Sequence, residues 1–400
     1  MNFFYNARKV LQQNIREYGM YIALFLIMTI FTITTQGTFI SSRNIVNLIN
    51  QTGYIAVLAV GMTLIIIIRQ IDLSVGFLAG FLGAIAAIAM ANPKVMPNGL
   101  NLPIYAVIPL TLFLGVIAGL LTAFLVAQMK IPSFVASLAG WLIYRGAILV
   151  VTESTGTIII ANEAFNAIGN GFIPDIPDIG ILPGVHKLTL ILGVLAVVLL
   201  IANEFNDRRK KQSYNFEVLP TEIFVLKLIF LALIISGITW VLAGYQGLSW
   251  TAVVVLIVAL IYNFVMSQTI LGRHIYAIGG NPDAAELSGI SVKRLIYVVF
   301  GSMGMLSALS GILFASRLQS ATTTAGTLFE LDAIAAAYVG GVSAAGGVGK
   351  VVGSIIGALV MTSLTSGMNL MGIGISYQYI VRGAVLAAAV IFDVTTRGKN

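Results

Sequence analysis

Long apolar runs are the feature that most constrains what this chain can fold into. Runs of roughly 16 to 24 residues recur along the sequence, and a helix needs about 20 apolar residues to cross the hydrocarbon core of a bilayer. They lie at about 18–36, 53–69, 73–91, 103–127, 134–151, 187–203, 222–243, 249–267, 293–316, 331–349, 351–371 and 377–394. Because these runs lack the apolar and polar alternation of a membrane barrel, the sequence predicts an all-α polytopic membrane protein with about twelve apolar segments.

The composition excludes several other classes. Apolar residues make up 58% of the chain and charged residues 9%, against about 45–50% and about 25% in soluble domains. Cysteine is absent and His186 and His274 are the two histidines, so disulfides, cysteine-based zinc sites and His-rich metal clusters are excluded. We therefore expect no metal site. A net charge of +7, spread mostly over loops, also gives no reason to expect nucleic-acid binding.

Lysine and arginine in short loops resist translocation and stay on the cytoplasmic side. Here they collect before the first apolar segment and after every second one, at Arg8, Lys9, Arg16, Arg69, Lys130, Arg208 to Lys211, Arg273, Lys293, Arg294, Lys350, Arg397 and Lys399. Arg43 and Lys94 are exceptions, which a statistical bias tolerates. Both termini are therefore predicted to be cytoplasmic, and the long loop at 152–186 to be external.

The segment 331–349 is the weakest predicted span. It runs into VGGVSAAGGVGK at 339–350, whose glycines make a poor helix. Non-helical backbone at membrane depth is tolerated where protein or water covers it. We expect a broken or re-entrant segment here, with a tightly packed glycine-rich helix as the alternative. The candidate pathway or structural residues in it are Gly340, Gly341, Ser343, Gly346 and Gly347.

Few ionisable residues lie within the apolar segments. Asp72, Glu330 and Asp332 stand near segment ends, where we expect them to cap helices. Arg145 lies several residues inside a segment, so it is either a functional group or a side chain that extends to the interface. Asp72, Ser74, Gly76 and Arg145 are further candidate pathway or structural residues.

No ATP-binding or catalytic motif is present. The sequence GGVGKVVG at 346–353 lacks the spacing of a phosphate-binding loop, its Ser or Thr and the strand that precedes it. We expect no catalytic residue and no cofactor on this chain.

A polar stretch, GRHIYAIGGNPDAAELSGISVKR, occupies 272–294. It predicts a turn at Gly279 and Gly280, and then a short helix that Asn281 caps, Pro282 opens and Gly289 ends. Apolar and acidic side chains on one short helix suit docking into a partner, whereas the alternative is an ordinary structured loop. The candidate docking residues are Gly279, Gly280, Asn281, Pro282, Asp283, Ala284, Ala285, Glu286, Leu287, Ser288, Gly289 and Ile290.

The region 179–245 is predicted to be a helical hairpin around the polar sequence NDRRKKQSYN at 206–215. Because a hairpin crosses the membrane twice, it leaves the orientation of the later segments unchanged. We interpret the hairpin as an addition to a smaller core.

Four motifs in this order resemble those of permease subunits of bacterial ABC sugar importers of the ribose and xylose type. They are the stretch at 272–294, QIDLSVG at 70–76, PSFVASLAGWLIYRG at 132–146 and ELDAIAAAYVGGVSAAGGVGKVVGSIIGAL at 330–359. The resemblance covers most of the chain. Gln70 departs from it, because the family often has glycine there. The hairpin is similar to that of the longer permeases of xylose and multiple-monosaccharide systems.

The resemblance implies a single transmembrane permease domain over 1–400, with a ten-helix importer core, the extra hairpin and a cytoplasmic coupling loop at 272–294. It also implies a homodimer in the bacterial cytoplasmic membrane, in contact with lipid. Its partners would be a sugar ABC ATPase, which binds ATP and Mg and docks on 279–290, and an extracytoplasmic sugar-binding protein. The substrate would be xylose or a related pentose or hexose.

Three alternatives stay open. An ion-coupled secondary sugar carrier would import without an ATPase, but the acid-poor segments argue against it. A passive facilitator would leave the stretch at 279–290 without a docking role. Related ABC permeases for nucleosides or branched-chain amino acids differ from the leading interpretation only in substrate.

Overall fold

The computed structural model describes residues 15–93, 98–153, 155–177, 180, 182–216 and 218–397. The predictions for Arg8, Lys9, Lys94 and Lys399 fall outside these residues. The chain forms two compact units. Unit 1 comprises Met1–Ile15, Ile40–Asn47 and Phe172–Ser249, and unit 2 comprises Arg16–Phe39, Leu48–Gly171 and Trp250–Asn400.

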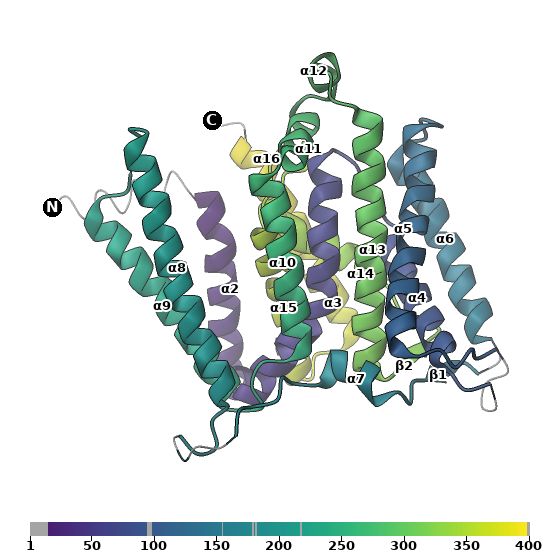
Figure 1. The fold of residues 1–400 in the computed structure, drawn as a ribbon, viewed down its shortest axis with the longest axis horizontal. Coiled ribbons are helices and arrows are strands. Elements are labelled where there is room, and N and C mark those ends of the chain that lie inside the picture. The colour runs from purple at the N-terminus through teal and green to yellow at the C-terminus, as the bar shows by residue number, and fades with distance from the viewer. Residues whose placement is uncertain are drawn as a thin grey trace. The chain divides into compact units, whose positions relative to one another are not determined.

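Helices dominate the described residues (Figure 1). Unit 2 and its boundaries hold α2 (Ile15–Thr34), η1 (Thr38–Ile40), α3 (Ser42–Ile67), α4 (Val75–Met90), α5 (Ile104–Ala127), α6 (Ser133–Thr152), α7 (Glu163–Asn170), α10 (Trp250–Gln268), α11 (Ile270–Gly280), α12 (Pro282–Leu287), α13 (Val292–Leu318), α14 (Phe329–Val339), α15 (Val351–Leu370) and α16 (Ile375–Arg397). The predicted apolar segments lie largely on helices, except that 331–349 is helical only to Val339, and the all-α membrane fold is confirmed. Among the described residues, nine helices are long and apolar enough to span a membrane, and α4 and Gly19–Thr34 are shorter apolar helices.

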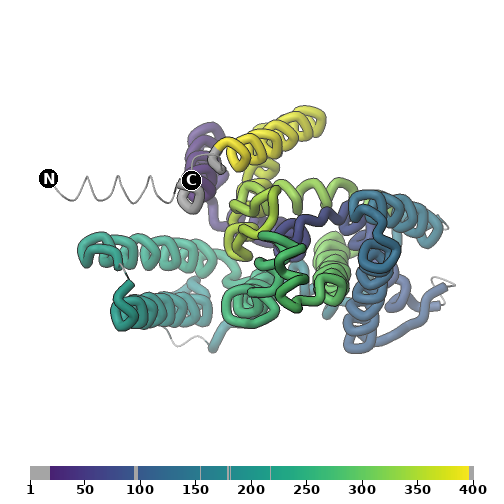
Figure 2. Tube along the Cα trace, turned by 90° about the horizontal axis from the view of Figure 1, so that it is seen from above, coloured from purple at the N-terminus to yellow at the C-terminus, as the bar shows by residue number. Residues whose placement is uncertain are grey.

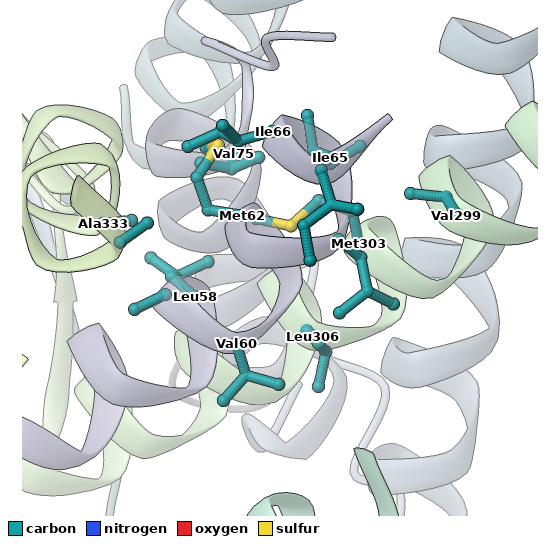
Figure 3. Packing of buried hydrophobic residues seen from close by; sticks show 14 of the residues in the cluster. Leu58, Val60, Met62, Ile65, Ile66, Val75, Val299, Met303, Leu306 and Ala333 are labelled. Carbon is teal, nitrogen blue, oxygen red and sulfur yellow. The ribbon is translucent and has the colours of Figure 1, made fainter. Parts of the chain in front are cut away.

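Helix α3 forms the core of unit 2. It is apolar on nearly all sides and is mostly buried, as expected of a helix that other helices surround. Leu58, Met62 and Ile65 on α3 pack with Met303 of α13 and Ala333 of α14 (Figure 3). By contrast, most side chains of α16 are exposed within the chain; Figure 2 looks along the helices and shows α16, in yellow, at the edge of the unit.

Glycines let helix backbones approach closely in unit 2. A Cβ added to Gly115 or Gly119 of α5 would meet the backbone carbonyls of Gly304 or Phe300 of α13. Such small-residue contacts are a common way to pack helices in membranes.

The predicted broken segment is confirmed too. Helix α14 ends at Val339, and residues 340–350 are non-helical before α15 begins at Val351. The two short strands β1 (Thr157–Ile159) and β2 (Ser320–Thr322) pair antiparallel, with Ile158 opposite Ala321. They lie at the end of unit 2 opposite α12 (Figure 1).

Unit 1 contains α8 (Lys187–Ser213) and α9 (Thr221–Ala243), which pack against each other. Lys227 Nζ and Glu204 Oε1 form an ion pair at 2.8 Å between the two helices. Arg208 donates to the carbonyl of Leu219 at 2.7 Å and lies over the ring of Phe224. These contacts join the two helices at the end where the basic run lies.

Asp175 organises the start of α8. Its carboxylate accepts from the backbone N–H of Leu188 at 2.8 Å and of Lys187 at 3.0 Å, which satisfies donors that the first turn of a helix leaves free. Desolvation raises the pKa of Asp175, but these N–H groups, that of Ile176 and the nearby His186 outweigh it and lower the pKa below its usual value. The carboxylate is thus held in its charged form.

Candidate functional site

The stretch predicted to dock a partner folds as two short helices at one end of unit 2 (Figure 1). Gly279 and Gly280 end α11 instead of forming the predicted turn, and the chain reverses at Asn281, whose backbone is extended. The turn was misplaced because the hydrogen bond from the Asn281 N–H to the Ala277 carbonyl, at 3.0 Å, continues the helix through both glycines. Asn281 then caps α12, with its side chain accepting from the N–H of Ala284 at 3.0 Å.

The end of α12 lies where the sequence predicted it, just before Gly289. The N–H of Ile290 reaches the carbonyl of Ala285 at 3.0 Å, and that of Gly289 reaches Glu286 at 2.9 Å. This pattern needs a left-handed residue after the helix, which Gly289 supplies with φ +84°.

Helix α12 presents most of its side chains to the outside. Ala285 is buried, whereas Asp283 and Glu286 are exposed and Leu287 is 90% exposed. Helix α12 therefore presents one apolar and two acidic side chains, on a helix capped at both ends, to whatever lies outside the chain.

The glycine-rich loop at 340–350 packs against α11. Its Gly341, Gly346 and Gly347 all have positive φ. The N–H of Gly347 donates to the carbonyl of Ile67 at 2.9 Å, and the hydroxyl of Tyr276 on α11 donates to the carbonyl of Gly349 at 2.7 Å. The loop therefore joins the ends of α3 and α11.

The other two candidate residues in this loop, Gly340 and Ser343, act through their backbone atoms. Gly340 faces the backbone of Gly353 so closely that a side chain would clash there. The N–H of buried Ser343 donates to the carbonyl of Val348 at 2.9 Å, which closes the loop on itself. The structure thus brings the loop and the end of α11 together, although they are far apart in sequence.

Arg69 is a residue of this site that sequence reasoning counted only as a loop cation. Its Nε donates to the carbonyl of Gly279 at 2.7 Å and its Nη2 to that of Gly280 at 2.5 Å. These are the last two carbonyls of α11, which a helix leaves without partners of its own. The sequence offers one weak sign of this role, which is that Arg69 directly follows an apolar run and so stands at the end of a predicted helix.

A second cluster surrounds the start of α4. Asp72 is buried, and its Oδ1 accepts from the N–H of Ser74 at 2.9 Å and from the Ser74 hydroxyl at 2.6 Å. On α6, the Ser133 hydroxyl accepts a hydrogen bond from the N–H of Ile71, and the Ser137 hydroxyl donates one to the carbonyl of Ile71. Two of the sequence motifs, at 70–76 and 132–146, therefore meet here.

The expected capping roles of three acids are wrong. Asp72 does not cap α4, since Ser74 occupies the N-cap position, and Glu330 and Asp332 lie in the first turn of α14. Glu330 is buried and accepts from the Trp141 indole at 3.1 Å. Asp332 forms an ion pair with Arg382 of α16. Such partners, 50 or more residues away in the sequence, cannot be seen in local patterns.

Gly76 is placed against this cluster. A Cβ on Gly76 would meet the carboxylate of Glu330 and the backbone carbonyl of Gly326. The start of α4 therefore lies directly on the loop before α14 and on a buried acid. Glu330 Oε2 has no hydrogen-bond partner among the described residues.

Arg145 has a partner within unit 2. Its Nη1 donates to the carbonyl of Thr323 at 2.5 Å, and its guanidinium lies 5.1 Å from the centre of the Phe77 ring. It therefore ties α6 to the segment between β2 and α14.

A shallow cavity of about 440 Å³, wide open to the outside, lies beside α7 at the end of unit 2 opposite α12 (Figure 1). Its polar lining consists of Glu163, Asn166 and Asn170 of α7 together with Gln319. Amide and carboxylate groups of this kind form hydrogen bonds with hydroxyl groups. Among the described residues, no group of three or more His, Cys, Asp or Glu side chains is arranged to hold a metal ion.

Comparison with known proteins places the chain in a family. The family model described as branched-chain amino acid transport system / permease component matches residues 44–390. The xylose transport system permease protein of Haemophilus influenzae is 38% identical over 98% of this chain and 99% of its own length. That of Escherichia coli K12 is 37% identical over 97% of this chain and 94% of its own.

A ribose import permease of Haemophilus influenzae is 33% identical, over 94% of this chain and 93% of its own length. No solved structure gave a significant match. The matches cover nearly the whole chain, including the polar stretch at 272–294 and the glycine-rich loop. The chain belongs to the family described as branched-chain amino acid transport system / permease component, and it is a membrane-embedded transport subunit rather than an enzyme.

Proposed function

We propose that this chain is the membrane-spanning subunit of an ATP-driven ABC importer that translocates a monosaccharide, either xylose or a related pentose or hexose. The observation that carries the proposal is the identity of 37–38% to xylose permeases over 97–98% of the chain. The exposed, capped helix α12 supports it, because a subunit without an ATP site needs a rigid surface on which an ATPase can act.

The partners follow from this assignment. An ATPase subunit, which binds ATP and Mg, docks on residues 279–290. An extracytoplasmic sugar-binding protein delivers the sugar to the opposite end, where Glu163, Asn166, Asn170 and Gln319 line the cavity. The subunit works as a homodimer in the bacterial cytoplasmic membrane, with both termini on the ATPase side. In support, the C-terminal end of α16 lies at the same end of unit 2 as α12 (Figure 1).

Substrate class is tested by reconstitution. The chain is placed in liposomes with its ATPase and binding protein, ATP is enclosed on the ATPase side, and uptake of labelled xylose, ribose, leucine and a nucleoside is compared. Uptake of a sugar, dependent on ATP and on the binding protein, is the expected result.

Uptake of leucine in place of sugar would instead agree with the words that describe the family, and it would reject the monosaccharide assignment. A non-hydrolysable ATP analogue serves as the control for passive entry of the solute.

A further inference from the structure

Helix α12 has few routes by which to pass a displacement into the membrane. Ala285 is its buried residue, and Pro282 and Ile290 at its two ends are half-buried. The chain links it directly to α11 and α13. A push on α12 is therefore transmitted through Ala285, which packs in the core cluster of unit 2, and through the neighbouring helices. On the α11 side it reaches the helix end at Gly279 and Gly280.

Arg69 holds that helix end. It directly follows the apolar part of α3, in the left-handed conformation with φ +61°. Its guanidinium makes two hydrogen bonds, at 2.7 Å and 2.5 Å, to the two terminal carbonyls of α11. A planar fork of donors and a positive charge both suit the C-terminal end of a helix.

Backbone contacts leave this junction little freedom. The Gly347 N–H bonds the carbonyl of Ile67 at 2.9 Å, and added side chains at Gly279 or Gly346 would meet that same carbonyl. A side chain at Gly346 would also meet the Arg69 side chain. The ends of α3 and α11 and the glycine-rich loop are thus packed backbone to backbone, and the exposed Arg69 side chain lies at the edge of this junction.

The short connection that contains Arg69 leads straight to the buried cluster. Residues 68–74 join α3 to α4, and Asp72 and Ser74 lie three and five residues after Arg69. Ser133 of α6 fixes the N–H of Ile71 at 3.1 Å. Beyond it, Gly76 lies against Glu330. One connection therefore touches the end of α11 on one side and α6, α4 and α14 on the other.

We propose that Arg69 is the positioning residue that transmits movement of α12 and α11 to the α3–α4 connection, and so couples ATP hydrolysis to movement of the sugar path. This inference rests on the proposed function. Arg69 itself contacts neither the sugar nor ATP. Without its two hydrogen bonds, backbone packing alone holds the end of α11 against the end of α3, and the transmitted movement is weakened.

The test uses the complete reconstituted importer with Arg69→Gly and Arg69→Lys. Glycine accepts the left-handed backbone without strain, so Arg69→Gly removes the side chain alone. Lysine keeps the charge but lacks the planar fork. The matched control is Lys130→Gly, because Lys130 is an exposed cation with φ +56° in the connection between α5 and α6.

The readout is the number of sugar molecules imported per ATP hydrolysed. Co-purification of the ATPase and the melting temperature of the chain are measured beside it. For Arg69→Gly we expect a fall of about tenfold in this ratio, within the about 5- to 150-fold range of typical couplings between sites, while the ATPase still binds and hydrolyses ATP. Arg69→Lys is expected to be intermediate. Lys130→Gly is expected to match the wild type.

Two results would overturn the proposal. An unchanged ratio of sugar to ATP in Arg69→Gly would show that the contact is a helix cap only, and loss of ATPase binding would make Arg69 part of the docking surface. Failure of the proposed function is distinct from both, because then the wild-type protein itself would show no ATP-dependent uptake. If Arg69→Gly lowers the melting temperature, Arg69→Lys supplies the same comparison in a folded protein.

Discussion

Single residues in this protein join segments that lie far apart in the chain. Arg69 reaches the end of α11, Trp141 of α6 reaches Glu330, and Arg145 reaches the carbonyl of Thr323. The contacts of Trp141 and Arg145 satisfy polar groups on the apolar helix α6, whereas the exposed Arg69 side chain lies just after α3. Because unsatisfied polar groups are costly at membrane depth, such contacts define which segments must stay together.

The first prediction concerns Gly289. Gly289→Val places a β-branched residue at φ +84°, where even an ordinary side chain costs about 1–2 kcal/mol. The end of α12 should then unwind, and sugar uptake at equal membrane abundance should fall severalfold. Gly237→Ala on α9 is the control, since Gly237 lies outside the docking stretch, has no atom near its missing Cβ and has no positive φ. Equal uptake by both variants would show that the end of α12 has no part in transport.

At the scale of elements, much of the fold could be predicted from sequence. The apolar segments are helical apart from the break after Val339, which was visible because glycines accumulate there. Asn281, Pro282 and Gly289 delimited α12 because capping is a local effect. The contacts of Arg69, Glu330 and Asp332 were not predictable, since their partners lie 210, 189 and 50 residues away and no local pattern records such distances.

The second prediction concerns the contact between α4 and α14. Gly76→Ala puts a methyl group against the Glu330 carboxylate and the Gly326 carbonyl, so α4 must shift. Overpacking of this kind costs about 1–3 kcal/mol, and we expect a lower melting temperature in detergent together with weaker uptake. Gly146→Ala on α6 is the matched control, because nothing lies near its missing Cβ. If both variants melt like the wild type, the close approach of α4 to Glu330 is not a constraint.

At the scale of the whole molecule, unit 2 carries the exposed helix α12 at one end and an open polar cavity at the other. That separation suits a transporter that receives force on one side of the membrane and its solute on the other. Unit 1 contributes the α8–α9 hairpin, which remains our predicted addition to a smaller core.

The third prediction concerns orientation, and the absence of cysteine makes it easy to test. Leu287→Cys on α12 and Ile159→Cys on β1 change side chains that are 90% and 79% exposed. In intact cells whose outer surface is accessible, a membrane-impermeant maleimide should label Cys at 159 and not at 287. Permeabilised cells control for reactivity, because both positions should then react. The reverse pattern in intact cells would invert the proposed topology.

Docking of an ATPase on α12 is the central claim, and co-purification tests it most directly. The chain is solubilised mildly from its native cell, once as wild type and once with residues 282–288 scrambled, and the co-purifying proteins are identified by mass spectrometry. The account predicts an ABC ATPase with the wild type and its loss from the scrambled variant, with equal melting temperatures for the two chains. A folded wild-type chain that brings down no ATPase, or a scrambled variant that keeps it, would contradict the account.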